Sequence, residues 1–421
     1  MESMPDDGVM RAADGTPLKK SLARALRREK LRSFVLIAPL LLFILISFLA
    51  PIADMLFRSV QNDIVSDTLP ETVQVLADWD PTSGDAPDEA VFAALYRDFY
   101  QAREQRIHTR LGSRLNYESP GFSGMFRRTG REIRRYDEAG PYKSQFIETD
   151  EDWGSVETWR IIQKFSPRYT PGYYLTAIDA ESTSDSLQLK PEDERIYLKL
   201  FVRTMWMSIA ITVSCLLLGY PIAYLLAHVK RSTANVLLIL VLLPFWTSLL
   251  VRTSAWKVLL QQQGVINDIL VWANLIDDAG RLVMINNQTG TIIAMTHILL
   301  PFMILPLYSV MQTISPSYVR AAKSLGATDL TAFWKVYFPN TIPGIGAGAI
   351  LVFILAIGYY ITPELVGGTQ GVFISNRIAF HISTSLNWGL AAALGAMLLL
   401  LVLALFYCYD RIVGIDNVKL G

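Results

Sequence analysis

Cysteine and histidine are scarce in this sequence of 421 residues, which holds two of the first and four of the second. Cys215 and Cys408 both fall inside apolar stretches, where a thiol is usually a small buried hydrophobe. A disulfide framework in the polar part of the chain is therefore excluded. The histidines lack the spacing of metal ligands, which argues against a metal site.

An excess of charge of either sign is also missing, because 38 Lys and Arg residues balance 38 Asp and Glu residues. We therefore expect no nucleic acid among the partners. The sequence has no G-x-x-x-x-G-K-[ST] phosphate-binding loop, so we expect the chain itself to bind no ATP. It also lacks a convergent group of acids, bases or metal ligands. These absences predict a protein that is not an enzyme and that holds no cofactor.

Long apolar stretches are abundant, with 52% hydrophobic residues and a mean hydropathy of +0.31. A helix that crosses a bilayer needs about 20 mostly apolar residues. Since its backbone polar groups must be paired within the segment, we predict an all-α integral membrane protein with about six transmembrane helices. The six stretches that qualify are residues 34–57, 201–227, 234–256, 290–312, 341–362 and 389–413.

Basic residues beside the first stretch set the predicted orientation. Such residues favour the cytoplasmic side, so we expect residues 1–33 to be a cytoplasmic basic tail. The stretch at 34–57 is too long for the apolar part of a signal peptide, which predicts a retained span. Counting spans then places the 313–340 segment and a short tail at 414–421 inside. The basic residues of the amino-terminal flank are Lys19, Lys20, Arg24, Arg27, Arg28, Lys30 and Arg32.

Residues 58–200 separate the first two spans and are predicted to form an extracytoplasmic insertion domain. Apolar residues at helical intervals predict a helix over 88–111, ending near Gly112, and a second from Ser123 to about Tyr136. Aromatic residues are too frequent for a solvated linker, which indicates a mainly helical domain. An arginine cluster at 127–135 has two interpretations: it docks the acidic rim of a partner, or, more commonly, it is a solvated face paired with nearby acids.

The polar segment between the fourth and fifth spans carries helix signals that a simple turn would not need. Ser315 followed by Pro316 is a typical helix start, with a hydroxyl cap and proline in the first turn. Gly326 can end that helix in a left-handed conformation. Thr328 or Asp329 can cap the next helix.

The second helix of the segment is predicted over residues 330–337, and Pro339 is expected to stop it. Small residues on the first helix would let a partner backbone approach. Aromatic residues on the second would seat it against the rest of the protein. The pattern predicts helix, glycine hinge, helix. The seating residues are Phe333, Trp334 and Phe338.

The sequence RAAKSLGATDLTAFWKVYFP, Arg320 to Pro339, resembles the E-A-A-x-x-x-G-(x)9-I-x-L-P loop of ATP-binding-cassette (ABC) importer permeases. That loop couples the permease to its ATPase. Ala321, Ala322 and Gly326 match its small-residue part, and Val336, Phe338 and Pro339 match its close. Arg320 departs from the family by replacing the usual acidic residue, which would alter a polar contact with the ATPase.

The resemblance extends over most of residues 198–413. Residues 218–227 (LGYPIAYLLA), 245–256 (FWTSLLVRTSAW) and 361–368 (ITPELVGG) are similar to stretches of spermidine/putrescine-type permeases. The resemblance implies the type I importer permease fold, with residues 201–413 as the permease core, in the inner (plasma) membrane. It further implies two ATP-binding subunits, a second permease subunit that is either identical or a distinct paralogue, and an extracytoplasmic solute-binding protein.

The implied function is ATP-driven import by alternating access of a polyamine or a related small cationic solute. An opine-like compound, iron or thiamine is an alternative solute, and a membrane ligand sensor is an alternative class. The sequence offers six candidates for the translocation path, each with a structural alternative such as an aromatic belt, a contact with lipid headgroups or a pair between Glu364 and Arg377. They are Trp246, Arg252, Trp256, Tyr359, Tyr360 and Glu364.

Overall fold

A computed structural model describes residues 18–116, 119–183, 186–385 and 387–413. The predicted tail at 414–421 and the first part of the predicted tail at 1–33 lie outside these residues. The chain divides into two units, residues 1–57 and 58–421, and each is described by itself.

The first unit is one helical run that contains the first predicted span. It comprises α1 (Leu18–Ile44), a π-helical turn (Leu45–Leu49) and α2 (Ala50–Arg58). Residues 29–58 of this run are long and apolar enough to cross a membrane, and none of the apolar window is buried. The described residues of the basic flank are therefore helical and continue into the span.

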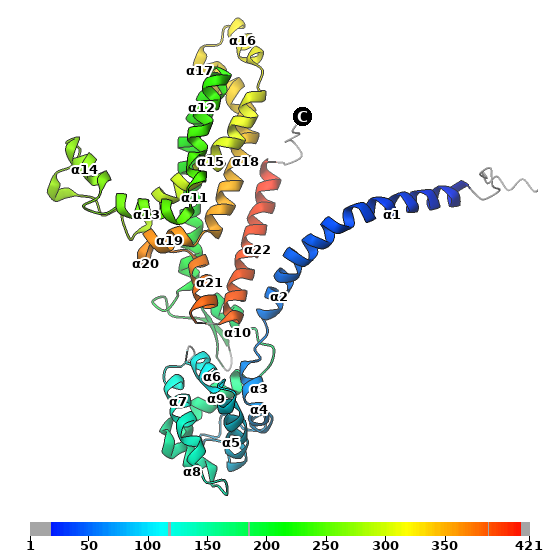
Figure 1. The fold of residues 1–421 in the computed structure, drawn as a ribbon, viewed down its shortest axis with the longest axis vertical. Coiled ribbons are helices and arrows are strands. Elements are labelled where there is room, and N and C mark those ends of the chain that lie inside the picture. Colours follow the sequence, from blue (N-terminus) through cyan, green and yellow to red (C-terminus); the bar gives the residue numbers. More distant parts are fainter. Residues whose placement is uncertain (1–17, 117–118, 184–185, 386, 414–421) are drawn as a thin grey trace, which may run out of the picture. The chain divides into compact units, whose positions relative to one another are not determined.

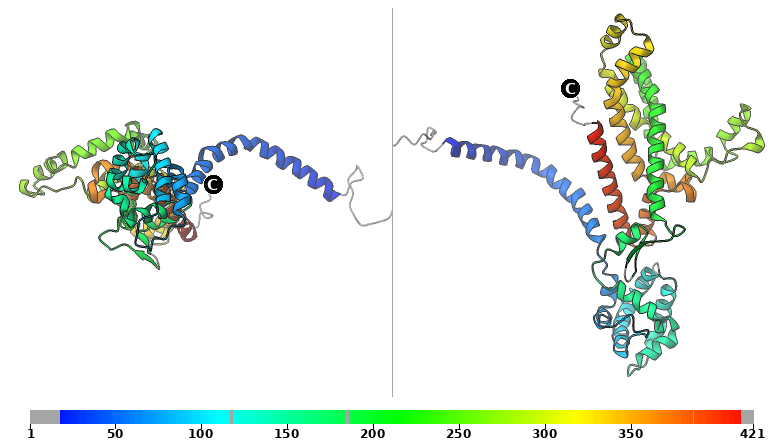
Figure 2. Two further views of the ribbon diagram at one scale, coloured as in Figure 1. Left: turned by 90° about the horizontal axis from the view of Figure 1, so that it is seen from below. Right: turned by 180° about the vertical axis from the view of Figure 1, so that it is seen from behind.

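The insertion domain is built from short helices, as predicted (Figures 1 and 2). A two-stranded antiparallel hairpin, which the sequence analysis did not predict, follows them and pairs Ala180 with Leu189. The helices are α3 (Ile64–Thr68), α4 (Pro70–Leu76), α5 (Glu89–Glu104), α6 (His108–Leu115), α7 (Phe122–Glu132), α8 (Tyr142–Thr149), α9 (Val156–Lys164) and α10 (Gly172–Ala177), and the strands are β1 (Ala180–Thr183) and β2 (Ser186–Leu189).

Buried aromatic rings form the centre of this domain. The Trp153 ring lies 5.5 Å from Phe126, 5.4 Å from Phe146 and 5.7 Å from Trp159, measured between centroids. Both indoles also satisfy their polar atom: Trp153 Nε1 donates to Thr129 Oγ1 at 2.9 Å, and Trp159 Nε1 donates to the Trp153 carbonyl at 2.8 Å. The N–H of a buried Trp usually finds such a partner. The rings of this core are therefore closely packed, and both indole N–H groups are hydrogen-bonded.

The predicted helix over 88–111 is wrong in its extent. α5 ends at Glu104, and Arg106 takes a left-handed conformation with φ of 60° before α6 begins. Gly112, expected to end a helix, lies inside α6, where a Cβ would stand 2.6 Å from the Phe126 Cβ. The glycine therefore serves close packing of α6 on α7. The second predicted helix is confirmed as α7 with a short 3-10 turn over Ile133–Arg135.

The remaining spans form a helical bundle in which α15 packs against both α11 and α18 (Figure 1). Its long helices are α11 (Tyr197–His228), α15 (Gln288–Thr313), α18 (Phe338–Gly358) and α22 (Trp388–Val413). The shorter helices are α12 (Arg231–Leu242), α13 (Leu249–Leu259), α14 (Val265–Trp272), α16 (Pro316–Ser324), α17 (Asp329–Ala332), α19 (Ile361–Val366), α20 (Gly368–Gly371) and α21 (Ile374–Ser383).

Five helices of the described chain are long and apolar enough to cross a membrane, or six if one bent pair counts as a span. The predicted span at 234–256 falls on that pair, which is bent by 94° after Trp246. Ser248 starts the second half by accepting a hydrogen bond from the Val251 amide. The predicted span at 341–362 also ends early, at Gly358, because Tyr359 is extended. A polar cap at Ser248 and an extended residue at Tyr359 thus divide two stretches that hydropathy alone reads as continuous.

Candidate functional site

The polar segment between α15 and α17 folds as its local signals predict. Ser315 caps α16 by accepting a hydrogen bond from the Ser317 amide, and Pro316 occupies the first turn. Gly326 has φ of 89°, the left-handed conformation that an L side chain strains. Thr328 then caps α17 by accepting from the Thr331 amide. We call residues 315–339 the docking loop.

Pro339 does not stop the second helix, which corrects the prediction. A π-helical turn over Phe333–Tyr337 joins α17 to α18, and residues 329–358 form one helical run. The Phe338 amide donates to the Phe333 carbonyl across this wider turn. Pro339 follows in the first turn of α18, so the widened turn accommodates a residue that lacks an amide hydrogen. The docking loop is consequently continuous with a span.

Aromatic contacts seat the second half of the docking loop on α11. The Tyr337 ring, which the sequence analysis missed, is buried 5.4 Å from the rings of both Tyr224 and His228. Phe333 lies 5.9 Å from Tyr224, as its predicted seating role requires. The spacing of four residues between Phe333 and Tyr337 is the signal that could have found the second ring.

Trp334 is wrong as a seating residue, since it is 55% exposed, whereas Phe338 is partly buried with its ring 5.9 Å from Tyr220. The Trp334 ring lies 4.9 Å from the Phe338 ring, at the exposed edge of the face that packs on α11. Val336 is partly buried. The predicted seating face is therefore confirmed for Phe333 and Phe338 only.

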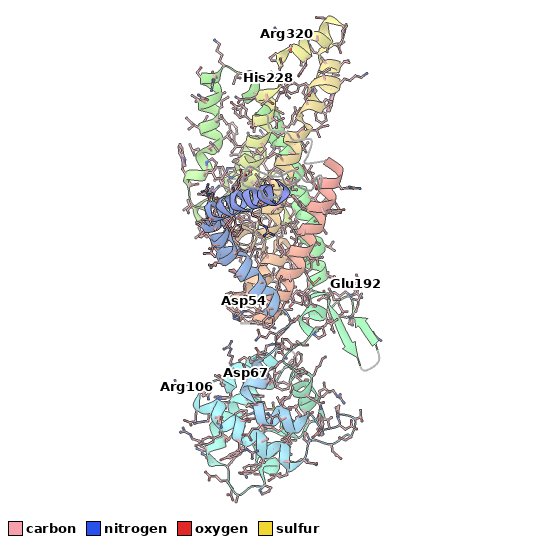
Figure 3. All side chains as sticks on the ribbon, turned by 90° about the vertical axis from the view of Figure 1, so that its right-hand side faces the viewer. Asp54, Asp67, Arg106, Glu192, His228 and Arg320 are labelled. Carbon is pink, nitrogen blue, oxygen red and sulfur yellow. The ribbon has the colours of Figure 1, made fainter. Side chains whose placement is uncertain are left out.

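The first half of the docking loop leaves its apolar and small residues uncovered. No residue of α16 is buried, and Leu325 beside the hinge is 90% exposed. Arg320 and Ala321 are exposed and Ala322 is half-buried, and Figure 3 labels Arg320 near the end of the bundle. Four large apolar side chains form what we call the apolar rim: Tyr318, Leu325, Leu330 and Trp334.

An ion pair between Lys323 and Asp329 ties the two helices of the docking loop together across Gly326. Both partners are exposed, so the pair contributes little to stability. It nevertheless links α16 to α17 across Gly326, the one glycine among residues 315–339, all of which the structure describes. The loop thus presents a surface whose shape is set by caps, a hinge and one polar contact.

A second group of residues gathers where α13 meets α15. Trp256 Nε1 donates to His297 Nδ1 at 3.0 Å, with the rings 5.3 Å apart. Arg252, one turn earlier on α13, is half-buried, and its buried Nε finds no hydrogen-bond partner among the described residues. His297, which the sequence analysis set aside, could have been found because it is the only Asp, Glu, Lys, Arg or His residue of α15.

The break after α18 is held by α21. Ser375 Oγ donates to the Tyr359 carbonyl at 2.6 Å, and Asn376 Nδ2 donates to the Tyr360 carbonyl at 2.9 Å. Asn376 Nδ2 also donates to Glu364 Oε2 at 2.6 Å. These bonds satisfy backbone carbonyls that the end of a helix leaves free. They also give Glu364 an amide partner.

The expected alternative partner of Glu364 lies elsewhere. Arg377 sits over the Phe380 ring, 5.7 Å from its centroid, and no ion pair between Arg377 and Glu364 occurs in the described chain.

A hydrogen bond of 3.1 Å between Thr253 Oγ1 and Thr362 Oγ1 ties α13 to α19.

The structure thus brings five of the six path candidates onto neighbouring elements, and it leaves one apart. Trp246 precedes the 94° bend and is 76% exposed, away from these contacts. Sequence could not reveal Ser375 or Asn376, because their partners are set by the tertiary fold. We call Arg252, Trp256, His297, Tyr359, Glu364 and Asn376 the polar cluster.

These features define a class of protein before any comparison is made. The polar cluster lies at broken helices beside apolar spans, partly buried and with Glu364 exposed, and membrane transporters tolerate irregular backbone at such places. At one end the bundle extends an exposed docking loop (Figure 1). No group of three metal-ligating side chains occurs among the described residues. The architecture is that of a multi-pass membrane permease.

Comparisons with known proteins specify the class. Residues 219–415 match the family described as "Binding-protein-dependent transport system inner membrane component". The chain is 33% identical over 224 residues to the spermidine/putrescine transport system permease protein PotB of Escherichia coli (strain K12), which covers 53% of this chain and 81% of that protein. It is 35% identical over 216 residues to PotB of Haemophilus influenzae, covering 50% and 75%.

A chain in a crystal structure of a bacterial ABC transporter involved in the import of the acidic polysaccharide alginate is 17% identical, with a TM-score of 0.42, covering 70% of this chain and 99% of that chain. From the relatives and the family match, the chain belongs to the binding-protein-dependent transport system inner membrane component family. It is a permease subunit of an ABC importer in the inner membrane, not an enzyme, and its class implies an ATPase and a binding protein as partners.

Proposed function

We propose that this permease imports a polyamine, spermidine or putrescine, into the cell. The observation that carries the proposal is the identity of 33% to 35% to permeases named for spermidine/putrescine transport, each covered over at least 75% of its length. Two ATP-binding subunits, a second permease subunit and an extracytoplasmic solute-binding protein complete the importer. Membrane lipid surrounds it.

The docking loop transmits the movement of the ATPase in this proposal. Ala321 and Gly326 leave room for a partner backbone, and the exposed apolar rim offers area to bury. The second half of the docking loop is continuous with α18. A displacement of the loop is therefore transmitted along one helical run to the break at Tyr359. Exposed Arg320 favours an acidic residue on the ATPase.

The polar cluster forms part of the path in this proposal. Within it Glu364 offers a carboxylate and Tyr359 a ring face, and the adjacent Tyr360 offers a second ring; these are the groups that attract an ammonium. Arg252 is positively charged, as a polyamine is, so it would repel a bound polyamine. It is therefore better suited to a gate than to a binding site. Movement of α13 against α19 would open or close that gate.

The coupling role is tested by placing bulk on α16. Ala321→Trp in the reconstituted importer should lower both binding-protein-stimulated ATP hydrolysis and spermidine uptake at least about tenfold, since a ring there prevents close approach of the ATPase. The matched control is Ala273→Trp, at an exposed alanine beyond α14. Unchanged uptake in Ala321→Trp would contradict the docking role.

The solute is tested separately in proteoliposomes that contain the complete importer. Labelled spermidine and putrescine should accumulate in the presence of ATP, and excess unlabelled iron or thiamine should not compete. Glu364→Gln should lower uptake and leave ATP hydrolysis in place. Accumulation of another solute, with no polyamine uptake, would reject the polyamine assignment and preserve the importer class.

A further inference from the structure

A concave surface of the insertion domain is lined mainly by arginine. The cavity has a volume of about 870 Å³ and lies between the α5–α6 turn and α7. Six arginines line it against a single carboxylate, that of Glu104. A volume of this size falls within the range of small-molecule sites, roughly 300–1,000 Å³.

Existing ion pairs neutralise only part of this lining. Arg134 and Arg103 share the one carboxylate of Glu104, at 2.6 Å and 3.1 Å. Arg103 also donates from Nε to the Gly130 carbonyl at 2.7 Å, which fixes its guanidinium at the wall. Arg128 reaches outside the cavity to Asp150. These bonds hold part of the cavity wall in place, and the lining keeps an excess of positive charge.

Two arginines on α7 have no acidic partner in the described chain. Arg127 and Arg131 are exposed, line the cavity and lie on successive turns of one helix face. Like charges four residues apart destabilise a helix unless something compensates them. The nearby Glu132 pairs instead with Arg135, which does not line the cavity. The expected solvated face paired with acids therefore describes Arg128, Arg134 and Arg135 and not Arg127 and Arg131.

Arg106 supplies the third unpaired charge, and it does so at a conformational cost. It occupies the left-handed conformation (φ 60°) between α5 and α6, where Gly or Asn is usual (Figure 3). Its exposed side chain lines the same cavity. Backbone strain at a residue whose side chain faces a concave surface is the kind of local conflict found at binding sites.

We propose that this arginine-lined cavity binds a small multivalent oxyanion, with phosphate or carboxylate groups held by Arg106, Arg127 and Arg131. Guanidinium groups match such oxygens in pairs of parallel hydrogen bonds. A polyamine would be repelled, so the cavity is separate from the path of the proposed solute. Its concavity favours a small anion over a protein surface, which needs a broad, nearly flat contact.

The test uses the full-length permease in detergent micelles, titrated calorimetrically with inorganic pyrophosphate at constant ionic strength. The wild type should bind, and Arg127→Gln/Arg131→Gln should weaken binding about a hundredfold, because two charge-assisted contacts are lost. Arg135→Gln is the control: it removes one positive charge from the same segment outside the cavity and should leave affinity within about twofold.

A second variant separates binding from folding. Arg106→Asn removes the charge and keeps a residue that tolerates the left-handed conformation. It should weaken pyrophosphate binding about tenfold while the melting temperature stays equal or rises. A loss of both binding and stability would assign Arg106 a structural role and contradict the proposal.

The source of the oxyanion is distinguished by repeating the titration in nanodiscs. Competition by phosphatidylglycerol discs, absent in phosphatidylcholine discs, identifies a lipid headgroup, and equal binding in both identifies a soluble anion. Either result supports the site. Absence of pyrophosphate binding in the wild type overturns it, and so does a double variant whose sole defect is weaker association with an acidic protein partner.

Discussion

The insertion domain and the helical bundle differ in how completely they bury their apolar side chains. In the insertion domain the large aromatic residues are enclosed, with Phe92, Phe99 and Trp153 fully buried. In the bundle only 28% of the apolar window of α11 is buried, and even the central α15 reaches 61%. The first domain therefore has a complete core of its own, and the bundle does not.

The difference follows from the solvent of each region. Burial of apolar area in water stabilises the insertion domain directly. The outer faces of α11 and α22 expose apolar side chains, which are unfavourable in water. Lipid or a partner subunit must therefore cover them. The aromatic core of α3 to α9 and the apolar core around α15 are separate clusters, although α10 of the insertion domain packs on α22. Each of these two cores can thus be perturbed by itself.

The largest expected effect is loss of the aromatic centre. Trp153→Ala removes a buried ring and the hydrogen bond that its indole donates to Thr129 Oγ1, so we expect a loss of about 3–5 kcal/mol of local stability. Hydrogen exchange should rise over α5 to α9 and remain unchanged over α11 and α15. The control Tyr100→Ala, at an exposed ring, should leave exchange in place. Faster exchange of α15 in the Trp153 variant would show that the regions are not independent.

A matched pair of leucines sharpens the comparison. Leu111 in α6 is fully buried and Leu217 in α11 is 69% exposed. Leu111→Ala should destabilise the insertion domain by about 2–5 kcal/mol, because a cavity is left. Leu217→Ala should change the thermal stability of the permease in nanodiscs far less. A large loss from Leu217→Ala would reveal a partner helix on that face, since both variants make the same change within a helix.

Much of the docking loop could be predicted from sequence because its signals are local. Ser315, Gly326 and Thr328 act on amides or dihedrals within three residues of themselves. The π-helical turn before Pro339 could not be predicted, because it depends on seating Tyr337 against α11.

The broken spans and the polar cluster show the same limit. Hydropathy registers apolar character but not the Ser248 cap that helps to divide a span. Asn376 satisfies a carbonyl 16 residues away in the chain, a contact that only the packing of α21 beside the break creates. Arg106 illustrates the opposite case: its left-handed backbone breaks a helix that side-chain periodicity predicts as continuous.

The smallest expected effect concerns pH and again falls on the insertion domain alone. Burial, with a contribution from the charge of Arg103, lowers the pKa of His108 below its ordinary value of 6.5. The folded domain then binds fewer protons than the unfolded chain as the pH falls below about 6.5, so its stability must fall with it. Above that pH the histidine is neutral in both states and contributes no pH dependence.

His108→Gln should therefore reduce the acid-side loss of stability. Hydrogen exchange over α6 and α7, compared at pH 7.5 and 5.5 after correction for the intrinsic exchange rate, should show a smaller difference in the variant than in the wild type. Thr109→Ala, a change at an adjacent exposed residue that does not titrate, should keep the wild-type difference. An unaltered pH response in His108→Gln would mean that other groups set it. A changed response over α15 would mean that the two regions share their stability after all.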